Sequence, residues 1–460
     1  MKIGSLPKEA IDHRAGYNAK VPVRTFDAVP RSRGDTVAGE DFNALISLTA
    51  MKCYRAPRRL PNCAGATGAR NRQHVDDCRQ LIVYLLADWI VLQKRPPLGR
   101  EFCGETLQSR GSTQLVAQQG GLAAIFRPIA DKEAVALAEA YYDVSGRAIR
   151  LTTEKDDTFL LEDSLGPKFI LKIANPAEDI TEIDCQVKLL RHIEHRDPKL
   201  PVPRVIPTRS NVLHFRYKDR AGQSRQVRLM SYLAGVPLSE ISSTKRIREK
   251  VGVVLGRLRL SMADYHHSAD ARVLAWDVKH LSSLQSLLSE IADPSQRATL
   301  EAAFARFAEI EHLIAATRWQ VVHNDFSKSN IVVDPNSSSV VSGIIDFGDA
   351  VRTSIAIDLS TALLNQLPAD DRADMFADAR DVLRGYLTVA DLEDAELRLV
   401  PHLVMARIVA RTVLTIWRAR VFPENADYIL RNTAQGWAQL NWFLQRSLTE
   451  VSDELLQAMR

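Results

Sequence analysis

Two short motifs in the second half of this 460-residue chain constrain its fold and chemistry most. The first has the spacing His323-x-Asp325-x-x-x-x-Asn330 between two apolar segments. The second is Asp346-Phe-Gly348 at the end of a further apolar run. Each motif alone would fit a tight turn rich in Asn, Asp and Ser between strands. Their combination makes chance a poor explanation, so we expect both turns to belong to one catalytic site.

The residue types in these motifs suit phosphoryl transfer, in which catalysis consists largely of positioning and of neutralising charge on the phosphoryl oxygens. We expect Asp325 to orient the acceptor hydroxyl and to accept its proton. Mg²⁺ prefers hard oxygen ligands, which the carboxylate of Asp346 and the side-chain carbonyl of Asn330 would supply. His323 is expected to brace the loop through hydrogen bonds and not to act as the base.

A cation for the nucleotide phosphates is predicted at Lys172, within the apolar segment Phe169–Ile173. Alternation along a strand places Lys172 on the face opposite to Leu171 and Ile173. A lysine with apolar neighbours on a central strand is costly unless it meets an anion. The alternative is an edge strand on which the lysine points to solvent.

The helix that follows offers two neighbours for this lysine. Glu182 and Gln186 are four residues apart and therefore share a helix face, and only Glu182 could form an ion pair. The chain contains neither G-x-G-x-x-G nor G-x-x-x-x-G-K-[ST], which disfavours a P-loop enzyme. Any loop that covers the phosphates is therefore expected to be the turn at 163–167.

The charge of the chain changes at about residue 120. Residues 1–120 contain 18 Lys and Arg against 11 Asp and Glu, a net charge of +7, and the rest contains 42 against 45, a net charge of −3. We expect 1–120 to be a poorly ordered basic extension with one helix at about 74–94. Its charges are scattered and few aromatic residues lie among them, so we expect no nucleic-acid binding.

Several features favour a cytoplasmic protein. Glu9 and Asp12 interrupt the N-terminus, which does not read as a secretory signal. The longest apolar run, 81–92, is too short to cross a bilayer and contains Asp88, so we expect no membrane span. The five cysteines lack a C-x-x-C spacing, and four of them lie in the first 120 residues, which gives little support to a zinc site.

From residue 121 onward the periodicity predicts a small sheet-rich part and then a larger helical part, which is an α+β pattern. A cleft between two such parts is a common ligand site. The predicted elements are helices at 128–142, about 180–190, about 251–265, 295–316, 370–387 and 394–421, and strands at 158–161, 168–173, 227–232, 320–322, 331–333 and 340–345.

With these motifs the chain resembles the aminoglycoside-phosphotransferase/choline-kinase-like kinases, whose hallmarks are H-x-D-x-x-x-x-N and D-F-G-D. Within that family it most resembles the hydroxylysine kinases and the related domains sometimes fused to class III aminotransferases. The resemblance covers about 121–447. Besides the two motifs, it is carried by 151–161, 171–176, 184–193, 227–235, Trp276-Asp277, Trp417-Arg418 and 423–428.

The resemblance implies a protein-kinase-like two-lobed fold, with an N-lobe over about 121–233, a C-lobe over about 234–450 and the extension at 1–120 preceding them. It further implies Mg²⁺-dependent transfer of the γ-phosphoryl group of ATP or GTP to a hydroxyl of hydroxylysine or a similar amino compound.

The resemblance also assigns roles by motif position. It makes Asp325 the catalytic aspartate, Asn330 and Asp346 the metal ligands, and Lys172 the phosphate-binding lysine. The hinge from Ser231 to Leu233 would present backbone groups to the nucleotide base. The helix carboxylate of the family falls on Gln186 here, so Glu182 is the remaining candidate for the ion pair with the lysine.

An amino-acid acceptor also needs a partner for its carboxylate. Arg407 and Arg411, one turn apart on the helix predicted at 394–421, are the candidates, and a solvated arginine face is the competing interpretation for at least one of them. An aminoglycoside or a homoserine-like acceptor is the alternative within the enzyme class. A catalytically silent nucleotide-binding module is the alternative outside it.

Overall fold

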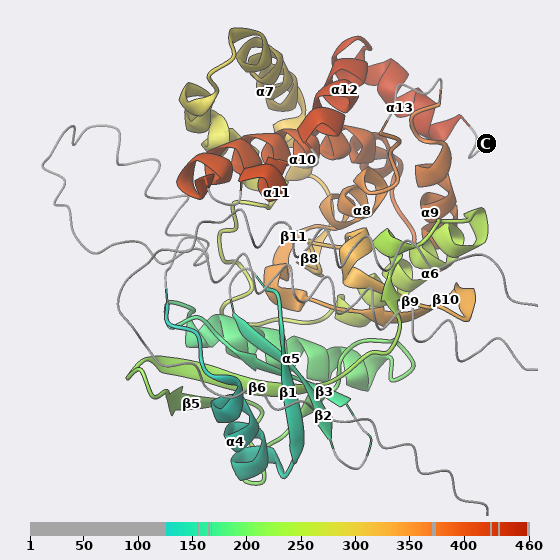
Figure 1. Cartoon of the computed structure of the whole chain (residues 1–460). Coiled ribbons are helices and arrows are strands. Elements are labelled where there is room, and N and C mark those ends of the chain that lie inside the picture. Colours follow the sequence, from blue (N-terminus) through green and yellow to red (C-terminus); the bar gives the residue numbers. More distant parts are fainter. Residues whose placement is uncertain are drawn as a thin grey trace, which may run out of the picture. The chain divides into compact units, whose positions relative to one another are not determined.

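The computed structural model of the chain describes residues 126–153, 156–163, 166, 168–369, 374–423, 426–430 and 433–457. The extension expected at 1–120, the helix expected at 74–94 and the four cysteines of that segment lie outside these residues. The described residues form a small lobe around one antiparallel sheet and a larger, mainly helical lobe (Figure 1). The predicted two-lobed α+β fold is confirmed.

The small lobe is a sheet with the strand order β1-β2-β3-β6-β4, in which β5 also pairs with β6. All of its pairings are antiparallel. Its elements are α4 (Asp131–Tyr142), β1 (Gly146–Leu151), β2 (Asp157–Asp163), β3 (Lys168–Ile173), α5 (Ile180–Arg196), β4 (Val205–Ile206), β5 (Phe215–Lys218) and β6 (Ser224–Ser231).

The two faces of this sheet differ because side chains alternate along each strand. Leu171 and Ile173 of β3 are fully buried in a cluster with apolar residues of α4. Lys172 points to the opposite face, where α5 lies between the sheet and the large lobe (Figure 1). The expected placement of Lys172 opposite Leu171 and Ile173 is therefore confirmed.

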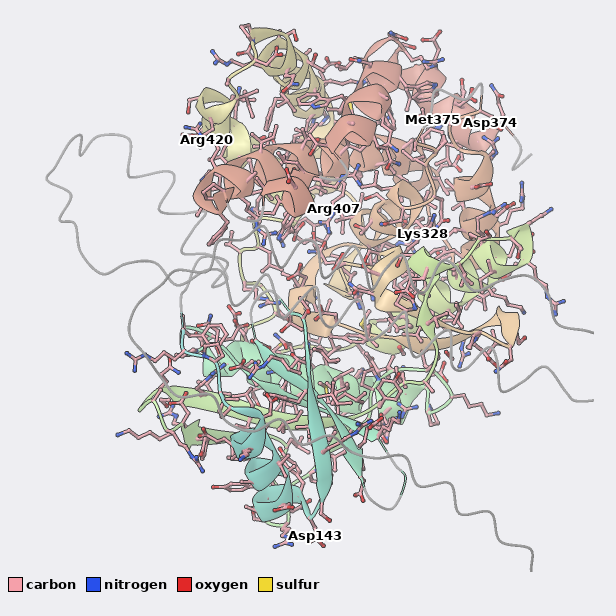
Figure 2. The ribbon with its side chains drawn as sticks, in the orientation of Figure 1. Asp143, Lys328, Asp374, Met375, Arg407 and Arg420 are labelled. Atoms are coloured by element: carbon pink, nitrogen blue, oxygen red, sulfur yellow. The ribbon has the colours of Figure 1, made fainter. Side chains whose placement is uncertain are left out.

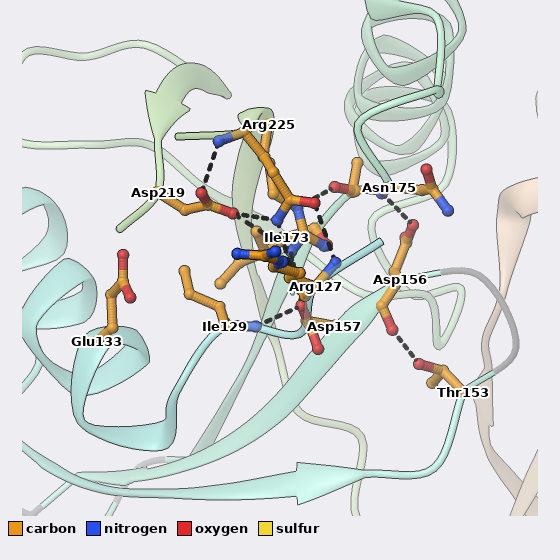
Figure 3. Close-up of polar contacts among 12 residues, drawn as sticks. Arg127, Ile129, Glu133, Thr153, Asp156, Asp157, Ile173, Asn175, Asp219 and Arg225 are labelled. Atoms are coloured by element: carbon orange, nitrogen blue, oxygen red, sulfur yellow. Dashed lines mark hydrogen bonds and ion pairs between the residues drawn. The ribbon is translucent and has the colours of Figure 1, made fainter. Parts of the chain in front are cut away.

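A buried ion-pair cluster fixes the connections at one end of the sheet (Figure 3). The side chain of Arg225 is buried, and its Nη1 lies 2.7 Å from Oδ2 of Asp157. Its Nε donates to the carbonyl of Ala174 (2.7 Å). Next to Asp157, Asp156 accepts a hydrogen bond from the backbone N–H of Asn175 (3.2 Å). These contacts anchor the β1–β2 and β3–α5 connections, both of which border the site described below.

The large lobe follows a short hinge after β6. Its strands form two small sheets, β10-β9-β7 and β11-β8. Its elements are β7 (Val236–Pro237), α6 (Lys245–Met262), α7 (Pro294–Ile314), β8 (Trp319–Val322), β9 (Ile331–Asp334), β10 (Ser337–Ile344), β11 (Val351–Ser354), α8 (Ile355–Leu364), α9 (Ala377–Leu387), α10 (Asp394–Val421), α11 (Ala426–Leu430), α12 (Thr433–Leu444) and α13 (Leu448–Leu456), with four 3₁₀ segments at 238–240, 278–290, 328–330 and 347–349.

Helix α10 is the centre of the large lobe and contacts α7, α8, α11, α12 and α13. Its first turn is held by a capping box between Glu393 and Glu396. In the described part of the chain it is the one helix long and apolar enough to cross a membrane, but 83% of its most apolar window is buried within the lobe. That degree of burial is typical of a core helix.

Most elements lie within a few residues of their predicted bounds, and α10 spans the predicted 394–421. Helical periodicity places Tyr141 on the apolar face of the helix predicted at 128–142 and Ile180 on that of the helix predicted at about 180–190, and the structure contradicts both placements. Tyr141 was expected on the buried face of α4, but it is 38% exposed and its neighbour Tyr142 is buried. Ile180 is 39% exposed because it is the first residue of α5. The elements additional to the prediction are strands β1, β4, β5, β7 and β11 and helices α8, α11, α12 and α13.

Candidate active site

A cavity of about 590 Å³ lies between the sheet of the small lobe and the helices of the large lobe. It is bordered by the β1–β2 connection, β3, β6, the loop after β8, the turn after β10, and helices α8, α10, α11 and α12. Four residues predicted from the motifs, Lys172, Asp325, Asn330 and Asp346, line it together. The structure thus joins the two sequence motifs and the strand lysine in one place.

The loop after β8 presents Asp325 to this cavity. Strand β8 ends at Val322, and Asn324 has a left-handed backbone (φ 61°) that turns the chain sharply. The N–H of Asn324 donates to Oδ1 of the buried Asp358 on α8 (2.8 Å), which holds the turn from below. Nδ2 of Asn330 donates to both the carbonyl and Oδ2 of Asp325, at 3.0 and 2.7 Å.

The surroundings of Asp325 favour its protonated form. Burial raises its pKa to about 7, and the neighbouring carboxylates of Asp349 and Asp346 act in the same direction. The guanidinium of Arg407 and the hydrogen bond from Asn330 oppose that rise. A carboxyl with a pKa near neutrality can both accept and release a proton at physiological pH.

His323 is buried beneath the loop and does not line the cavity. Its Nε2 donates to the carbonyl of Ile345 (3.0 Å), and its Nδ1 accepts from the N–H of Asp325 (3.3 Å). Burial lowers the pKa of His323, so the imidazole is held neutral. It joins the loop of Asp325 to the strand end that carries Asp346.

Asp346 also has a left-handed backbone (φ 62°), which directs its carboxylate away from the strand that precedes it. Its Oδ1 lies 3.5 Å from Nζ of Lys172. The charge of Lys172 lowers the pKa of Asp346 to about 2, despite the opposing effect of burial. Asp346 is therefore ionised at every pH at which the enzyme would work.

The expected pairing of Glu182 with Lys172 is wrong. Glu182 accepts from Nη1 of Arg272 (2.6 Å), and the same guanidinium donates to the carbonyls of Gly348 and Ala350. Glu182 therefore reaches the Asp346 turn indirectly, through Arg272. Glu182, predicted as a nucleotide-binding residue, is not among the described residues that line the cavity.

A row of three polar side chains crosses the sheet above the cavity, and two of them were not predicted. Thr158, Lys172 and Arg228 are direct cross-strand partners on β2, β3 and β6. Arg228 is 5% exposed, and its Nη2 donates to Oε1 of Gln186 (3.2 Å). Gln186 thus pairs with Arg228 and not with Lys172. The signal in the sequence was an arginine within the apolar run 227–232.

The loop expected over the phosphates is also corrected. Thr152, Thr153 and Asp156 of the β1–β2 connection line the cavity, whereas no described residue of the 163–167 turn does so. The difference follows from the sheet: antiparallel pairing of β1, β2 and β3 places the β1–β2 connection and the β2–β3 turn at opposite ends. Lys172 lies at the end near Asp156, because its partner Thr158 is at the start of β2.

The hinge residues do not line the cavity. The N–H of Ser231 donates to the carbonyl of Arg204 (2.8 Å), and its Oγ accepts from the N–H of Arg204 (2.8 Å). Leu233 packs close to Gly343, where an added Cβ would lie 3.0 Å from it. Ser231 is thus held within the small lobe by Arg204, whereas Leu233 contacts β10 of the large lobe.

The two arginines predicted on α10 differ in their hydrogen-bond partners. Arg407 is 6% exposed, and its guanidinium donates to the carbonyls of Trp276 and Asn324. It supports the loop of Asp325, and the alternative of a solvated arginine face is wrong for it. Arg411 lines the cavity one turn further along α10 and donates to Oε1 of Gln439 at 3.3 Å.

The oxygen atoms that face the cavity are suitable ligands for a divalent cation. Both hydrogen bonds of the Asn330 amide use Nδ2, so its carbonyl oxygen is the atom left to bind a cation. The carboxylate of Asp346 is half exposed towards the cavity, which Asp349 also lines. Hard oxygen donors of this kind are the ones that Mg²⁺ prefers.

Comparisons with known proteins agree with this geometry. The family model described as the phosphotransferase enzyme family matches residues 147–397. A hydroxylysine kinase from Danio rerio is 24% identical over 332 residues, which cover 69% of this chain and 92% of that protein. A hydroxylysine kinase from Mus musculus is 22% identical over 348 residues, which cover 70% of this chain and 92% of that protein. A homoserine kinase from Rhodospirillum rubrum is 26% identical over 293 residues, with 61% and 83% covered.

Solved structures show the same fold. An amicoumacin kinase, solved in complex with AMP-PNP, Ca²⁺ and Ami, superposes with a TM-score of 0.53 at 18% identity, and the match covers 70% of this chain and 93% of that one. A microcompartment-associated aminopropanol kinase gives a TM-score of 0.52 at 20% identity, covering 68% and 98%.

Proposed function

The chain belongs to the phosphotransferase enzyme family, and from that premise we propose that it transfers the γ-phosphoryl group of ATP or GTP to a hydroxyl of hydroxylysine or a similar small amino compound. The observation that carries the proposal is the meeting of Asp325, Asn330, Asp346 and Lys172 in one cavity. The hydroxylysine kinases matched over 92% of their length support the choice of acceptor. A nucleotide donor is consistent with the predicted cytoplasmic location.

In the proposed reaction the acceptor hydroxyl oxygen forms a bond to the γ-phosphorus while the bond from that phosphorus to the β–γ bridging oxygen breaks. The hydroxyl proton passes to the carboxylate of Asp325, and the nucleoside diphosphate leaves. Lys172 would neutralise charge on the transferred group, as cations do in phosphoryl transfer. Mg²⁺, held by Asn330 and Asp346, would supply further neutralisation of the phosphate oxygens.

The remaining residues have supporting roles in this proposal. His323 keeps the Asp325 loop aligned with the Asp346 turn through its two hydrogen bonds. Arg407 holds the same loop from α10. Arg272 ties the Asp346 turn to α5 through Glu182. Each acts on the reacting groups through another residue.

A homoserine-like acceptor is the second candidate, and the relative from Rhodospirillum rubrum supports it. An acceptor panel separates the candidates: purified protein is incubated with Mg²⁺, with ATP or GTP, and with hydroxylysine, homoserine or kanamycin, and release of the nucleoside diphosphate is measured. We expect release with hydroxylysine above the level given by the Asp325→Asn variant. Equal release by both proteins with every acceptor would overturn the proposal.

A further inference from the structure

The cavity has a second end whose charge differs from that around Asp325. Every Asp and Glu among its described lining residues lies in the β1–β2 connection, before α5, in the Asp325 loop or in the Asp346 turn. The described lining residues on α8, α10, α11 and α12 include three arginines, Arg407, Arg411 and Arg418, and no Asp or Glu. This end, which begins at Arg407 beside the Asp325 loop and continues along α10, favours an anionic group.

Arg411, at this end of the cavity, is largely buried, and its hydrogen bond in the described structure does little to balance its charge. Burial and the neighbouring charge of Arg407 lower its pKa to about 10. The hydrogen bond that the described structure gives its guanidinium goes to a neutral acceptor, Oε1 of Gln439, at 3.3 Å. A guanidinium has five donors, and a buried cation without an anionic partner is costly. An anion entering the cavity would remove that cost.

Two hydroxyl groups beside Arg411 also have unused hydrogen-bonding capacity within the described structure. Thr412 is 1% exposed and lines the cavity, and its Oγ1 is buried without a hydrogen-bond partner. The same holds for Oγ1 of Thr433, in the first turn of α12. Buried polar atoms are nearly always hydrogen-bonded in folded proteins, so two such atoms lining one cavity point to a bound ligand.

The surroundings of Gly436 show that Arg411 and Thr412 lie close together. A Cβ added at Gly436 would lie 3.1 Å from Oγ1 of Thr412 and 3.9 Å from Nη2 of Arg411. Thr433 precedes Gly436 by three residues and therefore lies on the same side of α12. The N-terminal end of a helix carries partial positive charge, which adds to that of Arg411.

We propose that Arg411, Thr412 and Thr433 bind the carboxylate of the acceptor, so that the enzyme phosphorylates hydroxy amino acids in preference to amino alcohols and to polycationic aminoglycosides. The inference rests on the proposed kinase function and specifies its substrate class. A carboxylate matches this site because it accepts several hydrogen bonds from a guanidinium and hydroxyl groups at once.

The spacing along α10 restricts the acceptor further. Arg407 supports the Asp325 loop, and Arg411 is one helical turn away, which is about 5.4 Å along the axis. If Arg411 binds the carboxylate, we expect an acceptor with its hydroxyl at Asp325 to carry that carboxylate several bonds away. Hydroxylysine and homoserine meet this requirement, whereas the hydroxyl and carboxylate of serine are closer together.

The test compares acceptors that differ only in the carboxylate. Homoserine is paired with 3-aminopropan-1-ol, and hydroxylysine with 1,5-diaminopentan-2-ol, and KM and kcat are measured for each under the conditions of the acceptor panel. We expect each amino acid to have a KM about 10- to 100-fold below that of its decarboxylated partner, because charged hydrogen bonds are lost with the carboxylate.

Variants of α10 assign that preference to Arg411. Arg411→Gln should raise the KM for the amino acid about 10- to 100-fold, with a smaller change in kcat, and should leave the KM for the amino alcohol near its original value. Arg411→Lys should restore part of the preference, and Thr412→Val should reduce it less than Arg411→Gln. The control is Arg420→Gln, because Arg420 (labelled in Figure 2) lies on the same helix but does not line the cavity. Its Nη1 pairs with Oε2 of Glu290 at 2.5 Å.

The outcomes distinguish this inference from the kinase assignment. If the amino alcohols react as well as the amino acids, or if Arg411→Gln keeps the original preference, the inference is wrong and the kinase function stands. If no acceptor gives more diphosphate than Asp325→Asn does, the kinase function fails. Calorimetry measures the binding of homoserine to the Asp325→Asn variant and to the double variant Asp325→Asn/Arg411→Gln. A weaker affinity of the double variant would support the carboxylate contact independently of turnover.

Discussion

The two ends of the cavity differ in how their polar groups are paired. At the donor end, defined by Lys172, Asp325, Asn330 and Asp346, the groups contact one another: Lys172 pairs with Asp346, and Asn330 donates to Asp325. At the acceptor end, defined by Arg411, Thr412 and Thr433, the two hydroxyl groups have no described partner. The donor end is organised by its own contacts, whereas the acceptor end is completed by its ligand. The difference places reaction chemistry at one end and selection of the acceptor at the other.

The largest expected effect tests the donor end at Asp346, its proposed metal ligand. Replacing Asp346 by Ala removes the carboxylate that faces the cavity and the partner of Lys172. We expect turnover to become undetectable and the Mg²⁺ dependence of nucleotide binding to disappear, because phosphate-bound Mg²⁺ is held by one or two carboxylates. A Mg²⁺ titration of nucleotide affinity measures this. Asp334→Ala, at the end of β9, is the control, and an unchanged titration for Asp346→Ala would refute the assignment.

The next effect tests the donor end at its base. Asp325→Ala should lower kcat by about 10²- to 10⁴-fold, the usual contribution of a general base. Nucleotide affinity and the preference between amino acid and amino alcohol should stay near those of the original enzyme, because neither depends on the proton. Residual single-turnover rates and binding constants give both quantities. Turnover like that of the original enzyme would remove Asp325 from the mechanism.

The two arginines of α10 provide a stability test of the same contrast. Arg407→Gln deletes charged donors to the carbonyls of Trp276 and Asn324, so we expect the free energy of unfolding to fall by about 2 to 4 kcal/mol. Arg411→Gln removes a buried cation without an anionic partner in the described structure, and we expect the stability of the free enzyme to stay the same or to rise. Denaturant unfolding of both variants measures their free energies of unfolding. Equal decreases in the two variants would contradict the proposed difference between Arg407 and Arg411.

The sequence predicts the fold well where the pattern is local. The hairpin of β2 and β3 and the long helix α10 follow from alternation and from helical periodicity, each within one continuous segment. Strand β1 was missed because it is a partly exposed edge strand, with charged side chains at Arg147 and Arg150. The contacts that make it a strand come from β2, including the pairing of Arg150 with Asp157.

The site shows the same division. The donor end is predictable because its two loops carry their residues at fixed spacing. The partners of Lys172 and Glu182 could not be predicted from the sequence. They depend on the register of β3 with β6 and on the packing of Arg272. Asp358 was missed although it is the one charged residue in the mainly apolar run 355–364, and such a residue signals a buried polar contact.

The smallest expected effect concerns Asp358, which holds the Asp325 loop at the donor end. The test is whether ionising this buried carboxyl lowers the free energy of unfolding. Burial raises its pKa to about 6, against an ordinary value of 3.8, while the N–H of Asn324 opposes the rise. The native state therefore holds its proton more tightly than the unfolded state does. Stability from this group is present below pH 4 and is lost as the pH rises from about 4 to about 6.

We expect the loss to be about 2 kcal/mol or less between these pH values. Asp358→Asn should abolish it, because an amide does not titrate and its oxygen still accepts from Asn324. The measurement is the difference in unfolding free energy between the two proteins at pH 4, 5, 6 and 7, since other groups that titrate in both proteins cancel in that difference. If the difference in unfolding free energy does not change with pH, the pKa of Asp358 is the same in the native and unfolded states. Ionisation of Asp358 would then cost the native state no stability.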